Sequence, residues 1–284
     1  MRTLFIGGSG FIGRNLIASY DRGDAAYMSR HSSLELEDKG IEHILGSVTD
    51  ADKVMDTVKD FDVIVDLAGI WDEKEQKFMD VHLQGVKNIV AAVKKYDKNQ
   101  KLIYFSAMNT DFGASEYYRS KRIAEDNVYT LKNGLVIKPS TIFGPGDHIT
   151  DEIIRLAGKK LKKFPGLGNL APLHIDDLVT AFRAVTDQTG TLYFCSTEKM
   201  DLVDAINIVR EKTGMKPVKS METKVNINKL LQKITSKGIG TYDELMSLSL
   251  NRFRETTFVT RIVKNLKSYR EYLENYLSQN YRST

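Results

Sequence analysis

The chain has 284 residues, of which 42% are hydrophobic and 27% charged, with 41 basic and 37 acidic side chains and one cysteine, Cys195. This composition is typical of a globular protein, and a single thiol excludes an internal disulfide and a cysteine-based metal site, so no metal is expected. The net charge of +4 gives no reason to expect nucleic-acid binding, and no stretch approaches the roughly 20 apolar residues of a membrane span. Met1 leads into an apolar run without room for a signal peptide, so we expect a cytoplasmic protein.

Apolar runs alternate with helical patterns along the first half of the chain. The runs are continuously apolar, which is typical of a parallel sheet covered by helices on both faces. With right-handed crossovers, the predicted fold class is α/β, a doubly wound parallel sheet of the Rossmann type. The predicted strands are 3–6, 25–28, 42–45, 63–67, 102–105 and 135–137, and the predicted helices are 11–20, 50–59, 78–95 and 117–131.

The pattern changes after about Gly144, where Pro145-Gly146-Asp147 is predicted to be a turn. A lysine-rich helical piece at 159–163, a strand at 192–194 and an amphipathic helix at 202–209 follow, and from Lys216 on we expect helices. The sequence therefore predicts a first domain over 1–147 and a smaller, mainly helical region over 148–284 packed against it.

Three glycines lie between the first predicted strand and the first predicted helix. Gly7, Gly10 and Gly13 allow a tight turn, a close approach of backbone to a pyrophosphate, and close packing of helix on sheet. Phosphates would lie against free N–H groups at the start of the helix, at Phe11 and Ile12. Such glycines can also serve a turn without a ligand, but the strand before and the helix after favour dinucleotide binding over 1–147.

The end of the second predicted strand bears on the choice between NAD and NADP. The stretch 27–33 lacks the Asp or Glu that usually binds the adenosine ribose of NAD. Arg30 could instead meet a 2′-phosphate, with Ser29 and Ser32 as further donors, although an arginine in a surface loop needs no ligand. The pattern favours NADP(H) over NAD(H).

Ser106, Tyr117 and Lys121 form the second chemical pattern. Ser106 follows the predicted strand 102–105, and Tyr117 and Lys121 are four residues apart in a predicted helix, so both lie on one face. A free tyrosine has a pKa of about 10, and a neighbouring ammonium favours its phenolate and lowers that pKa, while the lysine can also bind the nicotinamide ribose. Ser106 would hydrogen-bond the reacting oxygen. The alternative is an exposed helix pair; the position after a strand-end serine favours catalysis.

Together these motifs resemble those of a known family. Residues 1 to about 213 are similar to an extended or atypical short-chain dehydrogenase/reductase, the NAD-dependent epimerase/dehydratase-like family. The motifs that carry the resemblance, in family order, are Gly7-x-x-Gly10-x-x-Gly13, Asp66-Leu67-Ala68-Gly69, Ser106, Tyr117-x-x-x-Lys121, Lys138-Pro139-Ser140-Thr141-Ile142-Phe143-Gly144 and Leu173-His174-Ile175-Asp176-Asp177-Leu178.

The resemblance implies the roles of further residues. In the family Tyr117 is the acid/base, Lys121 supports it, and Ser106 polarises the reacting oxygen. The implied activity is hydride transfer at a carbinol or carbonyl carbon by an NAD(P)-dependent oxidoreductase or epimerase. The substrate would be a small molecule such as a nucleotide sugar, bound with the help of region 148–284. Residues that would line the cofactor are Leu67, Ala68 and Gly69 in one turn, Pro139, Ser140, Thr141 and Ile142 beside the nicotinamide amide, and Val48.

Departures from the family pattern leave alternatives open. His82 stands where the family has an asparagine of a proton relay, and it either replaces that asparagine or is a polar helix residue. Gly46-Ser47-Val48 stands where an acidic residue near adenine is usual. The short spacing between Ser106 and Tyr117 looks like that of the accessory NADPH-binding subunit of respiratory complex I. The alternative function is therefore a non-catalytic NADPH-binding accessory protein.

Other features have structural interpretations beside functional ones. The Asp176-Asp177 pair is expected to cap the following helix. The lysines of 159–163 either border a substrate diphosphate or form a solvated face. The aromatic residues between Phe258 and Tyr281 are expected to pack on a core or a partner chain. Trp71 either caps a cleft or simply packs, and a homodimer would pair through helices 78–95 and 117–131.

Overall fold

The computed structural model describes residues 1–96, 98–113, 115–160, 162–165, 168–221 and 251–280. Contacts divide the chain into two units, Met1–Pro139 with Val179–Tyr193, and Ser140–Leu178 with Phe194–Thr284. The first unit thus consists of two stretches of the chain. The first stretch ends at Pro139 and not at 147, and the second, Val179–Tyr193, comes later in the sequence. The reason is that β10 (Gly190–Phe194) joins the sheet beside β6 (Gly134–Pro139), a long-range pairing that no local pattern marks.

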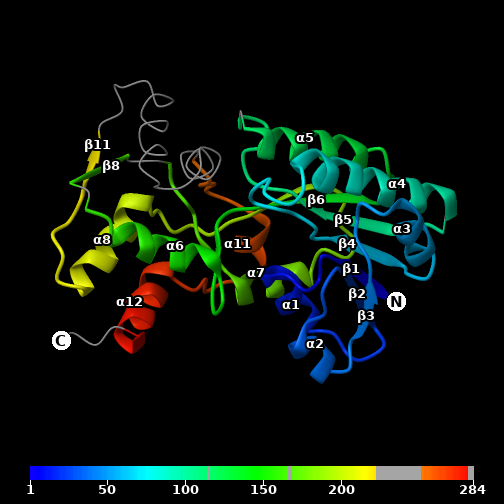
Figure 1. Ribbon diagram of the computed structural model, residues 1–284, viewed down its shortest axis with the longest axis horizontal. Helices are drawn as coiled ribbons and strands as arrows, with labels where there is room; N and C mark the ends of the chain where they lie inside the picture. Colours follow the sequence, from blue (N-terminus) through cyan, green and yellow to red (C-terminus); the bar gives the residue numbers. More distant parts are fainter. Residues whose placement is uncertain (97, 114, 161, 166–167, 222–250, 281–284) are drawn as a thin grey trace. The chain divides into compact units, whose positions relative to one another are not determined.

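The first unit is built on a seven-stranded sheet of order β10-β6-β5-β4-β1-β2-β3 (Figure 1). Its remaining strands are β1 (Thr3–Ile6), β2 (Ala25–Ser29), β3 (Glu42–Leu45), β4 (Val63–Asp66) and β5 (Lys101–Phe105), and the pairs among β1–β6 run parallel. Ile6 lies opposite Met28 on one side and Asp66 on the other. The strand order reverses between β1 and β4, and in such sheets ligands bind outside the carboxyl ends of the strands at that point.

Helices cover both faces of this sheet (Figure 1). One face carries α3 (Ala51–Val58), the π-helix η1 (Met79–Gln84), α4 (Gly85–Tyr96) and α5 (Glu116–Val128), and the other carries α1 (Phe11–Ile17) and α2 (Leu34–Asp38). Ile64, Ile89, Leu102 and Val136 are buried between the sheet and the first group of helices. Burial on both faces explains why the strands are continuously apolar, and it confirms the predicted doubly wound α/β class.

Local hydrogen bonds explain where two predicted helices begin. The Asp50 side chain accepts the backbone N–H of Lys53 at the start of α3, and Ser115 accepts that of Tyr118 at the start of α5. The predicted helix 78–95 is also present, but six of its residues, Met79–Gln84, are wound as a π-helix. Short π-helical segments are frequent at functional sites, and this one carries His82.

The second unit is mainly helical. Its helices are α6 (His148–Ala157), α8 (Leu202–Lys212), α11 (Phe258–Ile262) and α12 (Tyr269–Asn280), and it also contains the start of α7 (Ile175–Phe182) and the short strands β7 (Ile142–Phe143), β8 (Lys163–Pro165), β9 (Leu173–His174) and β11 (Lys219–Met221). Ile153, Ile206 and Leu273 belong to its buried core. Because β8 and β11 are strands, the predictions of a helix over 159–163 and of helices directly after Lys216 are wrong. Residues 222–250 lie outside the described part.

The C-terminal aromatic residues pack on the core of the second unit, as expected. Tyr269 is fully buried, and its ring centroid lies 4.7 Å from that of Phe143. The Tyr272 ring lies 5.3 Å from the same phenylalanine. Glu198 accepts the Tyr269 backbone N–H at 2.7 Å and so fixes the start of α12. Tyr281 lies outside the described residues.

The Asp176-Asp177 pair does not cap α7. Both residues lie inside its first turn. Asp177 accepts the backbone N–H of Lys267 at 2.8 Å, and Asp176 forms an ion pair with the Lys267 side chain. The pair therefore fastens the segment before α12. Of the helices in the described part of the chain, none combines the length and apolar character that crossing a membrane requires.

Candidate active site

The glycine turn after β1 is shaped by two glycines that the fold itself requires. Gly7 has a φ of +77°, and a Cβ there would lie 2.8 Å from the Ala68 nitrogen. A Cβ on Gly13 would lie 2.5 Å from the Gly8 carbonyl oxygen. Gly10 is different, because its Cβ would meet only the Gly7 oxygen, at 3.4 Å. The space beside the Gly10 Cα is therefore open, and we call this open space the cradle.

The start of α1 supplies hydrogen-bond donors at this cradle. Gly10 is the residue before the helix, and no side chain among the described residues caps it. The first N–H groups of a helix have no partner within it, so those at Phe11 and Ile12 can bind phosphate oxygens. The open side of Gly10 and these donors together fit the pyrophosphate of a dinucleotide.

The turn after β4 lies against the glycine turn. Asp66 is 1% exposed, and its carboxylate accepts the Ala68 N–H at 3.0 Å. The Leu67 N–H bonds the Ile6 carbonyl at 2.9 Å, which ties the turn to β1. Burial raises the pKa of Asp66 to about 7, while the Ala68 N–H and Lys121 act in the opposite direction. The turn over 67–69, which is predicted to line the cofactor, is therefore held to β1 by the backbone N–H of its first residue, Leu67.

Arg30 and Ser29 differ in their freedom to bind a phosphate. The Ser29 hydroxyl donates to the His31 carbonyl oxygen at 2.6 Å, and its role as a donor to a ligand stays a prediction. Arg30 makes an exposed ion pair with Glu75, its guanidinium 3.7 Å from the carboxylate. Such surface pairs contribute little free energy, so a phosphate can displace Glu75.

Tyr117 and Lys121 lie on one buried face of α5. They are 8% and 5% exposed, which contradicts the alternative of an exposed helix pair. The Lys121 ammonium donates to the Phe105 carbonyl oxygen at 2.9 Å and lies 5.1 Å from the centre of the Tyr104 ring. Burial lowers the pKa of Lys121 to about 8, whereas the charges of Asp66 and Glu125 raise it. The lysine therefore stays mainly charged at neutral pH.

Aromatic rings surround the Tyr117 side chain. The Trp71 indole stacks on it with a centroid distance of 5.4 Å and an interplanar angle of 11°. Phe78 and His82 meet it edge to face, at 5.7 and 5.5 Å. Trp71 is itself 66% exposed, so it covers Tyr117 and is not part of the core. Because a stacked pair contributes only about 0.5–1.5 kcal/mol, a ligand can displace this cover.

Ser106 hydrogen-bonds to a residue that the sequence analysis did not single out. Its hydroxyl donates to a carboxylate oxygen of Glu125, and both residues are buried. The role of Ser106 toward a substrate oxygen stays a prediction. A signal for Glu125 was present, because it follows Lys121 by four residues and so continues the face of Tyr117 and Lys121.

His82 connects three segments around the site. Its Nε2 accepts the Ile70 N–H at 3.2 Å, and its Nδ1 lies 2.8 Å from the Ser120 hydroxyl oxygen. Ser120 in turn donates to the Tyr117 carbonyl oxygen at 2.9 Å. Since Nε2 accepts, we assign the proton to Nδ1. Burial lowers the pKa of His82 to about 2, so the ring stays neutral and holds the backbone in place, which favours the structural alternative.

The other predicted cofactor residues have partners of their own. Val48 is buried, its carbonyl accepts the Asn88 amide at 2.9 Å, and the Pro139 carbonyl accepts the Met108 N–H at 3.0 Å. Ser140, Thr141 and Ile142 belong to the second unit. There the Ser140 hydroxyl donates to the Ala171 carbonyl at 2.7 Å, and Thr141 accepts the Leu173 N–H at 2.8 Å.

The second unit contains a pocket of about 380 Å³ lined almost entirely by basic side chains. Arg210, which is 5% exposed, shapes its wall by donating to the carbonyl oxygens of Ala157 and Lys159. Two members of the predicted lysine run are exposed and line it. The full lining is Lys162, Lys163, Arg210, Lys216, Pro217 and Lys219. The residues that line this pocket are therefore predominantly basic.

We predict that Gly10→Ala and Gly13→Ala separate ligand binding from folding. The Gly10 Cβ has room, so that variant should lose no more than about 1 kcal/mol of unfolding free energy, the difference between glycine and alanine before a helix. It should nevertheless weaken NADPH binding at least about tenfold by filling the cradle. Gly13→Ala should lose about 3 kcal/mol because its Cβ overlaps the Gly8 backbone. Urea unfolding and NADPH titration measure both effects; wild-type affinity in Gly10→Ala would contradict the cradle.

A second prediction concerns His82 and pH. Its folded pKa of about 2 lies below the ordinary 6.5, so the unfolded chain binds a proton below pH 6.5 that the folded protein does not. The wild type should therefore lose about 1.4 kcal/mol of stability per pH unit below 6.5 relative to His82→Gln. Asp66, whose raised pKa acts in the opposite sense, is common to both proteins and cancels. Urea unfolding at pH 7, 6 and 5 measures the difference, and parallel pH profiles would refute a buried neutral His82.

The sequence model of the NAD dependent epimerase/dehydratase family matches residues 3–193. Among curated relatives, a 3 beta-hydroxysteroid dehydrogenase/Delta 5-->4-isomerase of Mycobacterium tuberculosis is 26% identical over 180 residues, 52% of this chain and 48% of that enzyme. A dTDP-glucose 4,6-dehydratase of the same organism is 24% identical over 70% of this chain and 73% of its own. The NADH-ubiquinone oxidoreductase 40 kDa subunit of Neurospora crassa is 24% identical over 63% and 50%. The chain thus spans about half the length of the first and last of these relatives.

Solved structures share the fold at low sequence identity. The structure of gox2253 superposes with a TM-score of 0.75 at 17% identity, over 100% of this chain and 99% of that one. The Bordetella bronchiseptica enzyme WbmG, solved with NAD and UDP, gives a TM-score of 0.63 at 19% identity, over 79% and 82%. The family model covers well over half of the chain, and it covers the glycine turn, Tyr117 and Lys121. The chain belongs to the NAD-dependent epimerase/dehydratase family.

Proposed function

We propose that this protein is an NAD(P)-dependent oxidoreductase or epimerase of the short-chain dehydrogenase type, with Tyr117 as the acid/base. The observation that supports this most is the buried Tyr117–Lys121 pair on α5, in a chain of this family. A neighbouring ammonium favours the phenolate form of a tyrosine and so supports proton transfer by its hydroxyl. Tyr117 would take the proton of a substrate hydroxyl, or return it to a carbonyl oxygen.

The cofactor would be held by the first unit. The N–H groups around Gly10 would bind its pyrophosphate, Lys121 its nicotinamide ribose, and Arg30 the 2′-phosphate of NADP(H). The bound nicotinamide accepts or supplies the hydride. Lys121 would release its Phe105 carbonyl contact to bind the ribose while its charge still favours the Tyr117 phenolate. Above pH 8 the ammonium loses its proton and this support is lost, since burial lowers the pKa of Lys121 to about 8.

For the substrate we propose a nucleotide sugar. A dTDP-glucose 4,6-dehydratase is among the relatives, and WbmG was solved with UDP. Oxidation of the sugar carbinol, alone or followed by reduction from the other face, needs only the groups assigned above.

The second candidate is a non-catalytic NADPH-binding accessory protein. It is favoured by the similarity to the NADH-ubiquinone oxidoreductase 40 kDa subunit. In that case the nucleotide would stabilise the fold for a partner. Saturable NADPH binding without turnover in the wild type would favour it.

We predict that Tyr117→Phe abolishes turnover, lowering kcat by about 10³-fold, because the ring remains but its acid/base group is lost. The affinity for NADP(H) should stay nearly unchanged. Tyr129→Phe is the matched control, because it also removes one tyrosine hydroxyl. Tyr129 directly follows the last residue of α5, and its hydroxyl bonds Thr191. With UDP-glucose or dTDP-glucose as substrate, the assay follows NADP⁺ or NAD⁺ reduction for net oxidation, and it follows conversion of the sugar nucleotide for epimerisation, in which the hydride is returned and no net cofactor reduction occurs. Full activity in Tyr117→Phe would end the acid/base assignment.

A further inference from the structure

We propose that Glu125, held by Lys138, is a positioning residue for Ser106 and through it sets the rate of the chemical step. This inference rests on the proposed function, because it needs a reaction in which Ser106 takes part. The starting observation is that the Ser106 hydroxyl donates to Glu125 Oε1. A serine side chain has three staggered rotamers, and this bond selects the one whose oxygen lies at the carboxylate.

The Glu125 carboxylate has partners on both oxygens. Thr110 donates its hydroxyl to the same Oε1 at 2.8 Å, and the Lys138 ammonium lies 2.8 Å from Oε2. Glu125 and Lys138 side chains are each 3% exposed, so this ion pair is sheltered from water. A buried carboxylate that lacks such partners would be costly. Glu125 is therefore a fixed point within the protein interior.

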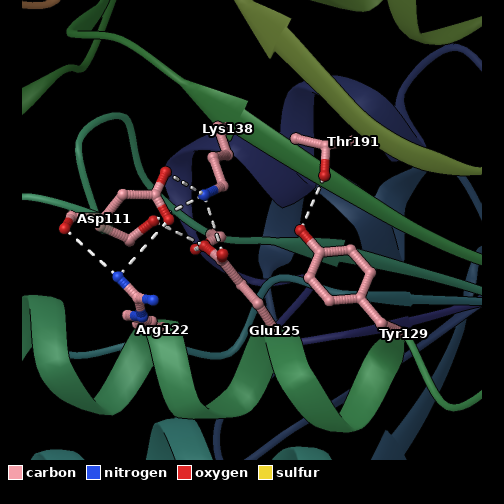
Figure 2. A network of polar contacts seen from close by, with 8 residues as sticks. Asp111, Arg122, Glu125, Tyr129, Lys138 and Thr191 are labelled. Carbon is pink, nitrogen blue, oxygen red and sulfur yellow. Dashed lines mark hydrogen bonds and ion pairs between the residues drawn. The ribbon is translucent and has the colours of Figure 1, made fainter.

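Lys138 in turn is held from a second side. Its ammonium donates to the Thr110 hydroxyl oxygen at 2.8 Å and to an Asp111 carboxylate oxygen at 3.1 Å. Figure 2 shows the Lys138 nitrogen between the Asp111 and Glu125 carboxylates, with Arg122 beside Asp111. Burial works against the charge of Lys138, but its bonds to Glu125 and Asp111 outweigh this effect and raise its pKa. The Lys138 ammonium thus stays charged over the ordinary pH range.

This network joins the three elements that carry the chemistry. Tyr117, Lys121 and Glu125 follow one another at intervals of four on α5, while Ser106 follows β5 and Lys138 lies in β6. Glu125 therefore sets where the Ser106 oxygen lies relative to Tyr117. When a reacting oxygen arrives, the serine proton can turn toward it without leaving Glu125 unpaired, because Thr110 and Lys138 still bind the carboxylate.

The test removes the ion pair as a unit. Removing Glu125 alone would leave the buried Lys138 ammonium with only the partly exposed Asp111 carboxylate as its opposite charge, whereas replacing both buried charges with apolar side chains of similar size is often tolerated. Glu125→Leu combined with Lys138→Met therefore removes the serine's acceptor while sparing the fold. Tyr129→Phe is the control, because Tyr129 directly follows the last residue of α5 and its hydroxyl bonds Thr191, not Ser106 (Figure 2). Thermal unfolding and NADPH affinity are measured for each protein.

The kinetic readout is a double-mutant cycle with Ser106→Ala, using NADP⁺ with UDP-glucose or dTDP-glucose. We expect the charge-pair variant to lower kcat about tenfold at unchanged NADPH affinity, since the serine then samples all its rotamers. Adding Ser106→Ala should bring kcat to the level of Ser106→Ala alone, because both changes remove one function. Losses that multiply, or wild-type kcat in the charge-pair variant, would overturn the proposal.

A second variant keeps the proposal falsifiable if the charge-pair variant does not fold. Glu125→Gln leaves an amide oxygen for Lys138 and should show a smaller kcat loss with the same non-additivity. A loss of kcat matched by an equal loss of NADPH affinity would indicate a merely structural role and overturn the inference. Absence of turnover in the wild type would refute the proposed function itself, and this inference with it, before any variant is compared.

Discussion

One buried ammonium organises the candidate site. Lys121 is held at the carboxyl end of β5 by the Phe105 carbonyl, with the Asp66 and Glu125 charges opposing the cost of its burial. Asp66 also shapes the turn that meets Gly7, and Glu125 also holds Ser106. The cation thus stands between the glycine turn that suits a dinucleotide and the residues that suit proton transfer. Loss of the Lys121 charge would therefore affect both dinucleotide binding and proton transfer.

The parts of this arrangement that depend on local sequence could be predicted. The continuously apolar strands, the turn from Gly7 to Gly13 and the four-residue interval between Tyr117 and Lys121 each involve neighbours in the chain. A parallel sheet buried on both faces imposes such apolar runs, and a strand-to-helix turn this tight requires glycine. The fold class and the buried pair on α5 therefore followed from patterns within short windows.

The parts that depend on distant contacts could not be predicted. The partner of Ser106 lies 19 residues away, and the partners of His82 come from another helix and a loop. The return of β10 to the sheet edge depends on pairing with β6. The lysines of 159–163 predicted a helix because lysine favours helices. The structure instead places Lys163 in β8, which pairs with β11. Tertiary contacts override local propensity in each case.

The most direct test of the account is a titration of the free protein with NADPH and, in parallel, NADH. Trp71, the only tryptophan of the sequence, stacks on Tyr117 and so reports on a nicotinamide that reaches the site. We expect saturable binding of both nucleotides, tighter for NADPH, with Trp71 emission changing at the same midpoint as nicotinamide emission. Tighter NADH would refute the role of Arg30. Absence of binding, or binding that leaves Trp71 emission unchanged, would contradict the central claim that a dinucleotide meets Tyr117.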